Sequence, residues 1–93
     1  MLTFNSTVYR TIAFGPRSGT GGRHCKYEMT HSNRHLAQGE ANGFLSEERG
    51  GLVDLRVEVR DQDGRLHSAS LVGTYRWDDT RKCAVLSTLG GIV

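Results

Sequence analysis

The sequence predicts an all-β protein, an antiparallel β-meander of about six strands that forms a strongly curled sheet or a small barrel. Apolar and polar residues alternate with a period of two along much of the chain, which is the pattern of half-buried strands. The clearest case is residues 53–60, where aliphatic side chains occupy the odd positions and charged side chains the even positions. Short segments that end in glycine separate several of the alternating runs, as hairpin loops do.

The first expected strand covers residues 2–14. Its apolar side chains fall on even positions, namely Leu2, Phe4, Val8, Ile12 and Phe14. Arg10 interrupts this face, so we expect a bulge or a strand end close to it. The next stretch, FGPRSGTGGRH (residues 14–24), contains four glycines but lacks the Gly-Lys-Ser/Thr ending of a phosphate-binding loop. We interpret it as a connection between strands.

Residues 21–38 allow two interpretations. In the first, Cys25, Tyr27 and Met29 alternate with polar residues, which indicates a second strand. In the second, residues 22–37 form a helix, and the protein belongs to the α+β class. We favour the strand, because the apolar stripe of such a helix is thin and no clear N-cap residue precedes it.

Three hairpin loops complete the predicted meander. The loop Gln62-Asp63-Gly64 places glycine where a three-residue hairpin needs a left-handed residue. It sets the following pairs opposite each other: Val59 and His67, Val57 and Ala69, Leu55 and Leu71. The loop Glu48-Arg49-Gly50 does the same for Leu45 and Val53, Gly43 and Leu55, Ala41 and Val57, Gly39 and Val59. A third loop, Asp79-Thr80-Arg81, sets Trp77 against Cys83 and Tyr75 against Val85. On this scheme the odd-numbered residues from Leu45 to Leu89 share one apolar wall.

Length and composition are typical of one small domain that spans residues 1–93. No stretch approaches the roughly 20 apolar residues that cross a bilayer, so we expect a soluble protein with no membrane association. Two cysteines, Cys25 and Cys83, are too few for a disulfide scaffold, and we expect them to be reduced and partly buried in a cytoplasmic protein. Residues 1–38 hold five basic side chains and one acidic one, whereas residues 39–93 hold seven basic and nine acidic ones.

No pattern of catalytic or metal-ligating residues stands out. His24, Cys25, His31, His35 and Cys83 include no Cys-x-x-Cys pair, and we expect neither a metal nor a cofactor. Cys25 follows His24 in the sequence, but neighbours on a strand point to opposite faces, and Cys83 is expected beside Trp77 and Val85, so no histidine is placed to activate either thiol. No serine lies in a G-x-S-x-G turn. We therefore expect no catalysis and assign no catalytic residue.

A binding role is the interpretation that remains. The predicted inner face of the curled sheet carries convergent polar and aromatic side chains that would suit a small apolar ligand: His67, Tyr75, Trp77, Tyr27 and His35. The edge strands and the C-terminal GGIV segment are expected contact surfaces for a protein partner. Because an unprotected edge strand tends to pair with another chain, we expect a homodimer. The predicted function is that of a small, non-catalytic binding or assembly module.

Two alternatives come from other features. The segment LVDLRVEVRDQDGRLHSASLVGTYRW (residues 52–77) resembles the last hairpin of hotdog-fold acyl-thioester hydrolases. The resemblance implies a hydrolase fragment with a long apolar helix that carries much of the active site. The segment GGRHCKYEMTHSNRHL (residues 21–36) is too polar for that helix, and no catalytic residue can be carried over. The basic first third, with Tyr9, Tyr27 and Trp77 as stacking groups, gives the other alternative, a weak nucleic-acid-binding module.

Overall fold

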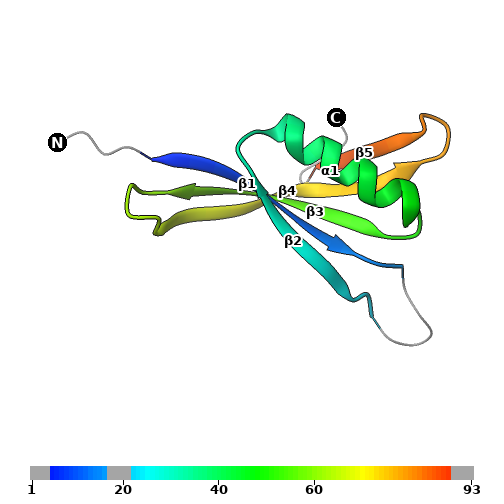
Figure 1. Ribbon diagram of the computed structural model, residues 1–93, viewed down its shortest axis with the longest axis horizontal. Coiled ribbons are helices and arrows are strands. Elements are labelled where there is room, and N and C mark those ends of the chain that lie inside the picture. The colour runs from blue at the N-terminus through cyan, green and yellow to red at the C-terminus, as the bar shows by residue number, and fades with distance from the viewer. Residues whose placement is uncertain (1–4, 17–21, 89–93) are drawn as a thin grey trace.

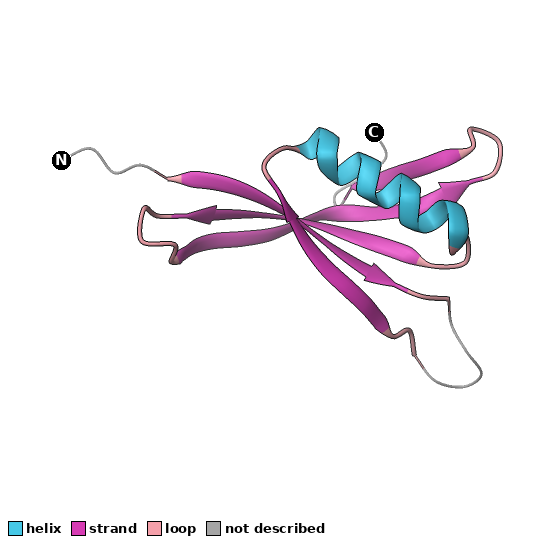
Figure 2. Ribbon diagram, viewed as in Figure 1, coloured by secondary structure: helices cyan, strands magenta, loops and turns pink. Residues whose placement is uncertain are grey.

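The computed structural model describes residues 5–16 and 22–88 and contains five strands and one helix in this part of the chain. In chain order the elements are β1 (Ser6–Phe14), β2 (Cys25–His31), α1 (Arg34–Glu47), β3 (Leu52–Arg60), β4 (Leu66–Asp78) and β5 (Cys83–Thr88). The strands are antiparallel and form one open sheet in the order β2-β1-β3-β4-β5, and α1 lies across one of its faces (Figures 1 and 2).

The fold is therefore mostly β with one helix, as in the α+β alternative. The prediction of six strands was wrong, and so was that of a curled sheet or barrel. The predicted residues Leu2, Phe4 and Leu89 and the GGIV segment lie outside the described residues.

Helix α1 replaces the strand predicted over residues 39–45. Asn33 caps its first turn, since its Oδ1 accepts a hydrogen bond from the Leu36 backbone N–H at 2.9 Å. Ala37, Ala41 and Leu45 recur at a spacing of four and are fully buried against the sheet. The expected hairpin at residues 48–50 is instead the connection from α1 to β3, and the helix alternative at 22–37 overlaps α1 only at 34–37.

The core lies between α1 and the face of the sheet that it covers. Three helix residues and five strand residues form it, namely Ala37, Ala41, Leu45, Ala13, Val53, Leu55, Tyr75 and Ala84. On β1 the covered positions are odd-numbered, because Thr11 and Ala13 are buried under the helix. The prediction that the even positions of β1 face this core was wrong. Those side chains point to the opposite face, which α1 leaves uncovered.

The β3–β4 hairpin confirms its predicted loop but not its predicted register. Gly64 has φ = 82°, and the Asp61 side chain accepts hydrogen bonds from the backbone N–H groups of Asp63 and Arg65, both at 2.9 Å. Next to the loop, Arg60 pairs with Leu66 as the loop requires.

The register then shifts twice, each time because β4 contributes one extra residue. After the first shift Val57 pairs with Ser70 and Arg56 with Leu71, so Val57 and Leu71 point to opposite faces. After the second shift, odd-numbered residues of β3 again pair with odd-numbered residues of β4, as Val53 does with Tyr75. The predicted partners of Val59, Val57 and Leu55 were therefore all wrong.

The β4–β5 loop is one residue longer than predicted. It spans residues 79–82 and holds Lys82 at φ = 58°, a left-handed conformation. Trp77 consequently pairs with Ala84 and Tyr75 with Leu86, rather than with Cys83 and Val85.

The molecule is elongated, with extents of 52 × 28 × 24 Å. The helix covers one end of the sheet, and the start of β1 projects beyond it together with the β3–β4 hairpin as a three-stranded arm (Figure 1). Residues 65–70 of this arm are all exposed. The one helix within the described ranges is too short and too polar to cross a bilayer.

Candidate functional site

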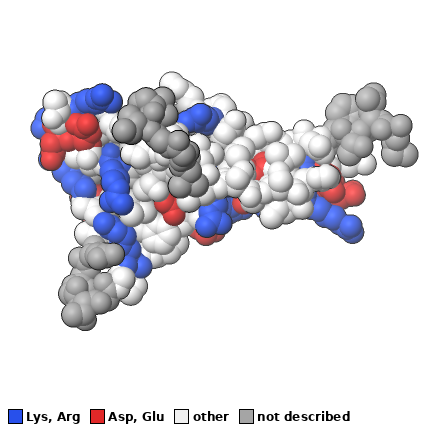
Figure 3. All heavy atoms as spheres, turned by 180° about the vertical axis from the view of Figure 1, so that it is seen from behind, with Lys and Arg blue, Asp and Glu red and all other residues white. Residues whose placement is uncertain are grey.

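The uncovered face of the sheet carries most of the charged side chains of the strands. The register places the following residues on it: Arg10, Asp54, Arg56, Glu58, Arg60 and Arg76. Figure 3 views the molecule from the side opposite α1 and shows Lys and Arg side chains from one end of this face to the other. Because the only helix of the described residues leaves this face uncovered, its charged side chains are accessible to a binding partner.

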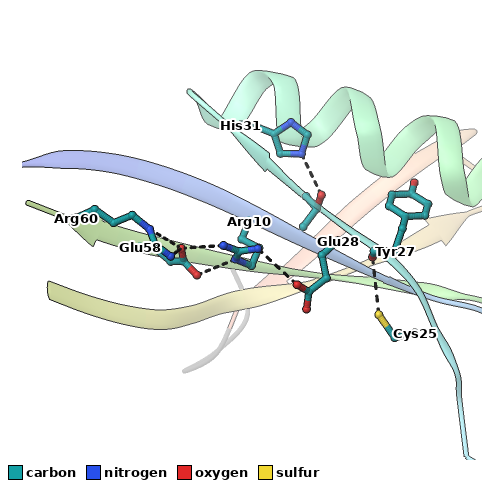
Figure 4. Close-up of polar contacts among 8 residues, drawn as sticks. Arg10, Cys25, Tyr27, Glu28, His31, Glu58 and Arg60 are labelled. Carbon is teal, nitrogen blue, oxygen red and sulfur yellow. Dashed lines mark hydrogen bonds and ion pairs between the residues drawn. The ribbon is translucent and has the colours of Figure 1, made fainter. Parts of the chain in front are cut away.

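Glu58 is the centre of an ion-pair network on this face. Its carboxylate accepts hydrogen bonds from Arg10 Nε at 2.8 Å, from Arg10 Nη2 at 3.3 Å and from Arg60 Nη2 at 2.9 Å (Figure 4). Arg10 also lies 3.5 Å from the carboxylate of Glu28 on β2. The side chain of Glu58 is only 8 % exposed, because the two guanidinium groups cover it.

The network keeps Glu58 ionised. Hydrogen bonding from Arg10 lowers the pKa of the Glu58 carboxyl, burial opposes this effect, and hydrogen bonding from Arg60 lowers the pKa further. A carboxylate whose lone pairs are occupied by two arginines is suited to joining β1 to β3, not to proton transfer. Arg10 is therefore a paired residue within a continuous ladder, whereas the register shift of β1 lies between Ala13 and Phe14. The bulge expected close to Arg10 lies three residues away, where β2 contributes one extra residue, Lys26, and β1 is regular at Arg10 itself.

A groove of about 450 Å³ opens on the same face of the sheet. It is lined by Phe14, Leu52, Asp54, Arg76 and Arg23. Arg23 precedes β2, and its Nη1 donates to the carbonyl oxygens of Gly15 at 3.1 Å and Gly50 at 2.7 Å. The groove therefore joins an apolar floor to two guanidinium groups and one carboxylate.

The five residues predicted to form a ligand site are spread over the core, its borders, the arm and the first turn of α1. Tyr75 is 1 % exposed within the core, where burial raises its pKa. His67 is exposed on the arm, and His35 is exposed in the first turn of α1.

Tyr27 and Trp77 lie at the borders of the core. Tyr27 packs edge-on against Phe44, with ring centroids 5.6 Å apart, and its hydroxyl donates to Glu40. Burial raises the pKa of Tyr27, and the hydrogen bond to Glu40 raises it further. Trp77 Nε1 donates to Asp79 at 3.1 Å, and the Arg49 guanidinium lies 5.3 Å from the centre of its ring. These contacts fix both side chains in packing roles.

The cysteines and histidines are dispersed. Both cysteines are free; Cys83 is half-buried as expected, whereas Cys25 is exposed, contrary to the expectation of partial burial. His31 Nε2 shares a hydrogen bond of 3.0 Å with the hydroxyl of buried Thr11. Within residues 5–16 and 22–88, no group of three or more His, Cys, Asp or Glu side chains is arranged to hold a metal ion.

The two edges of the sheet differ. Both backbone groups of Ala84 on β5 are bonded by helix side chains: Gln38 Nε2 donates to the carbonyl oxygen at 2.9 Å, and Asn42 Oδ1 accepts from the N–H at 2.8 Å. These amides occupy the place of a neighbouring strand. Among the described residues, no side chain of another element bonds the backbone of β2, and five of its seven residues are exposed. Sequence reasoning did not anticipate this difference, because it depends on where α1 lies.

Comparisons with protein-family models, with curated proteins and with solved structures find no match to this chain.

Proposed function

We propose that this protein is a non-catalytic assembly module that pairs with a second copy of itself through β2. The observation that carries the proposal is the difference between the two sheet edges. An open edge strand offers a row of backbone donors and acceptors to another strand, whereas a covered edge does not. β5 is covered at Ala84 by Gln38 and Asn42, and β2 is open.

The backbone directions of the sheet follow from Ala84. In an antiparallel pair, the N–H and C=O of a residue both point toward its partner or both point away, and the two cases alternate along a strand. The backbone N–H and C=O of Ala84 point away from Trp77, because both bond side chains of α1. The backbone groups of Leu86, two residues further, therefore also point away from β4. The backbone groups of Tyr75, opposite Leu86, must then point toward Val53 on β3.

The same alternation reaches β2. Val53 directs its groups toward β4, so Ala13 opposite it directs its groups away from β3 and toward Tyr27. The backbone groups of Tyr27 thus point toward β1. By alternation, the backbone groups of Glu28 and Thr30 point away from β1, toward the open edge of the sheet. These are the donors and acceptors that a second copy would meet.

Charge favours a particular pairing of two copies. When a two-fold axis relates two antiparallel edge strands, one residue faces its own copy. With Tyr27 at the axis, Lys26 of each copy faces Glu28 of the other, so two pairs of opposite charges form. An axis at Lys26 or Glu28 would place like charges together. The Tyr27 axis gives a continuous ten-stranded sheet with both helices on one side.

The test compares Glu28→Pro with Glu28→Ala by sedimentation across a range of concentrations. Both variants lose the carboxylate, but proline also removes the outward N–H of Glu28, a loss that an edge strand tolerates in the monomer, whereas alanine retains this N–H. We expect the wild type to be a dimer, and Glu28→Pro to be a folded protein whose association is weaker than that of Glu28→Ala by about tenfold or more. A wild type that remains monomeric at all concentrations would contradict the proposal. Steady turnover of an acyl-thioester would contradict its non-catalytic part.

A further inference from the structure

The groove on the uncovered face contains a guanidinium group held in a fixed orientation. Arg23 donates through Nη1 to two backbone carbonyls, one in the connection that follows β1 and one in the connection between α1 and β3. Its Nε and Nη2 make no hydrogen bond with the described residues. These N–H groups are therefore free to meet a ligand, and the two carbonyl contacts have already restricted the side chain.

Arg76 supplies a second guanidinium with no partner. It is exposed on β4 and forms no hydrogen bond or ion pair within the described part of the chain, although Asp54 lines the same groove. Asp54 instead accepts a hydrogen bond of 2.8 Å from the Thr74 hydroxyl. On the same face, Arg10 and Arg60 are both bonded to Glu58. The groove thus holds more positive than negative charge, and its two arginines, unlike Arg10 and Arg60, have no carboxylate partner among the described residues.

The remaining lining is apolar. Phe14 and Leu52 are direct partners across β1 and β3, and both are half-buried, so they form a floor beside the charged groups. The volume of about 450 Å³ lies within the range of about 300–1,000 Å³ that small-molecule sites occupy. Arginine binds carboxylate and phosphate oxygens through pairs of parallel N–H donors.

We propose that this groove binds a small molecule that joins an oxyanion, a carboxylate or a phosphate, to a compact apolar group. Arg76 and the free N–H groups of Arg23 hold the oxyanion, and Phe14 and Leu52 contact the apolar group. The proposal does not depend on self-association, because the groove is formed within one chain and lies on the face of the sheet rather than on its β2 edge.

The experiment titrates isotope-labelled protein with four probes and follows the backbone amide resonances. Phenyl phosphate and benzoate carry both proposed features, inorganic phosphate lacks the apolar group, and benzyl alcohol lacks the charge. We expect saturable shifts at the groove residues with phenyl phosphate or benzoate, with a Kd on the order of 1 mM or below for ligands of this size. Inorganic phosphate should bind more weakly, and benzyl alcohol should not bind. The tighter of the two aromatic probes identifies the oxyanion.

Two arginine substitutions provide a matched comparison. Arg76→Ala removes a groove guanidinium, and Arg56→Ala removes an equally exposed and unpaired guanidinium on the same face that does not line the groove. We expect Arg76→Ala to weaken binding about tenfold and Arg56→Ala to weaken it less than about twofold. Equal losses in the two variants, equal binding of benzyl alcohol, or no saturable binding of either aromatic anion would overturn the proposal.

Discussion

Arg10 and Arg56 lie directly opposite each other on β1 and β3. Like charges in this position destabilise a sheet, and only one of the two arginines, Arg10, is paired with a carboxylate among the described residues. Arg10 turns to Glu58, which is two residues along β3 from Arg56, and bonds it through two nitrogens. Arg56 remains exposed and has no partner in the described part of the chain. Glu58 is thus the residue that permits an arginine at position 10.

Replacement of Glu58 by glutamine should destabilise the fold in a pH-dependent way. Glu58→Gln leaves Arg60 without a counter-charge and Arg10 with only the more distant carboxylate of Glu28, and we expect a loss of about 2 kcal/mol in the free energy of unfolding at pH 7. The pKa of Glu58 is lowered in the folded state, chiefly by hydrogen bonding from Arg10. Its contribution is therefore fully present above the unfolded value of about 4.3 and is lost as the pH falls through the folded value below it.

Urea denaturation of both proteins between neutral and acidic pH provides the measurement. The difference between wild type and Glu58→Gln should be constant down to about pH 4.3 and shrink below it. Glu47→Gln serves as the control, since Glu47 is exposed on α1 and has no ion pair within the described residues. A difference that stays unchanged at acidic pH would show that the charge of Glu58 does not contribute.

Two glycines should respond in opposite ways to replacement by alanine. A Cβ at Gly73 would overlap the backbone carbonyl oxygen of Ser87 on β5, so Gly73→Ala must push these strands apart. A Cβ at Gly43 on α1 would meet nothing within 4 Å. We expect Gly73→Ala to cost about 2 kcal/mol or more and Gly43→Ala to add about 0.5–1 kcal/mol of stability. Thermal unfolding monitored by circular dichroism would measure both, and a stable Gly73→Ala protein would argue against the close approach of β4 and β5.

The helix could not be assigned from its sequence because residues 39–45 satisfy two patterns. Gly39, Ala41, Gly43 and Leu45 alternate as a strand would, while Ala37, Ala41 and Leu45 recur as a helix face would. Glycine is unfavourable inside a helix by about 1 kcal/mol relative to alanine, so local preference pointed to the strand. Packing of the alanine stripe against the sheet decides the outcome, and packing is a property of the whole fold.

The β3–β4 hairpin shows a different limit. The loop could be predicted from its glycine, and Gly64 adopts the expected left-handed conformation. The two register shifts could not be predicted, because the extra residues on β4, His67 and Val72, are ordinary strand residues. For the same reason the groove could not be anticipated. Alternation places Asp54 and Arg76 on the polar row, but Arg23 joins them only through contacts with two distant loops.

Removal of the two helix amides should expose the second edge of the sheet. In the double variant Gln38→Ala with Asn42→Ala, the N–H and C=O of Ala84 lose their partners. We expect a stability loss of about 2 kcal/mol from two hydrogen bonds and, at high concentration, assemblies larger than a dimer, because both edges are then open. Light scattering after size-exclusion chromatography would detect them. Gln62→Ala, in the exposed β3–β4 loop, should change neither property.

Charge exchange across β2 would test how two copies pair. In Glu28→Lys, positive side chains face each other at both positions of the proposed interface, and in Lys26→Glu negative ones do, so each variant alone should dissociate. An equimolar mixture places opposite charges at both positions and should recover a heterodimer, which native mass spectrometry resolves by mass.

Glu28 also contacts Arg10, so a control must separate the loss of that contact from repulsion between copies. Glu28→Gln removes the carboxylate without adding a positive charge, and it should retain much of the self-association that Glu28→Lys abolishes. If the mixture stays monomeric while wild type forms a dimer that Glu28→Pro disrupts more than Glu28→Ala, β2 pairs around another centre, because the backbone edge would still be required while Lys26 and Glu28 would not face each other.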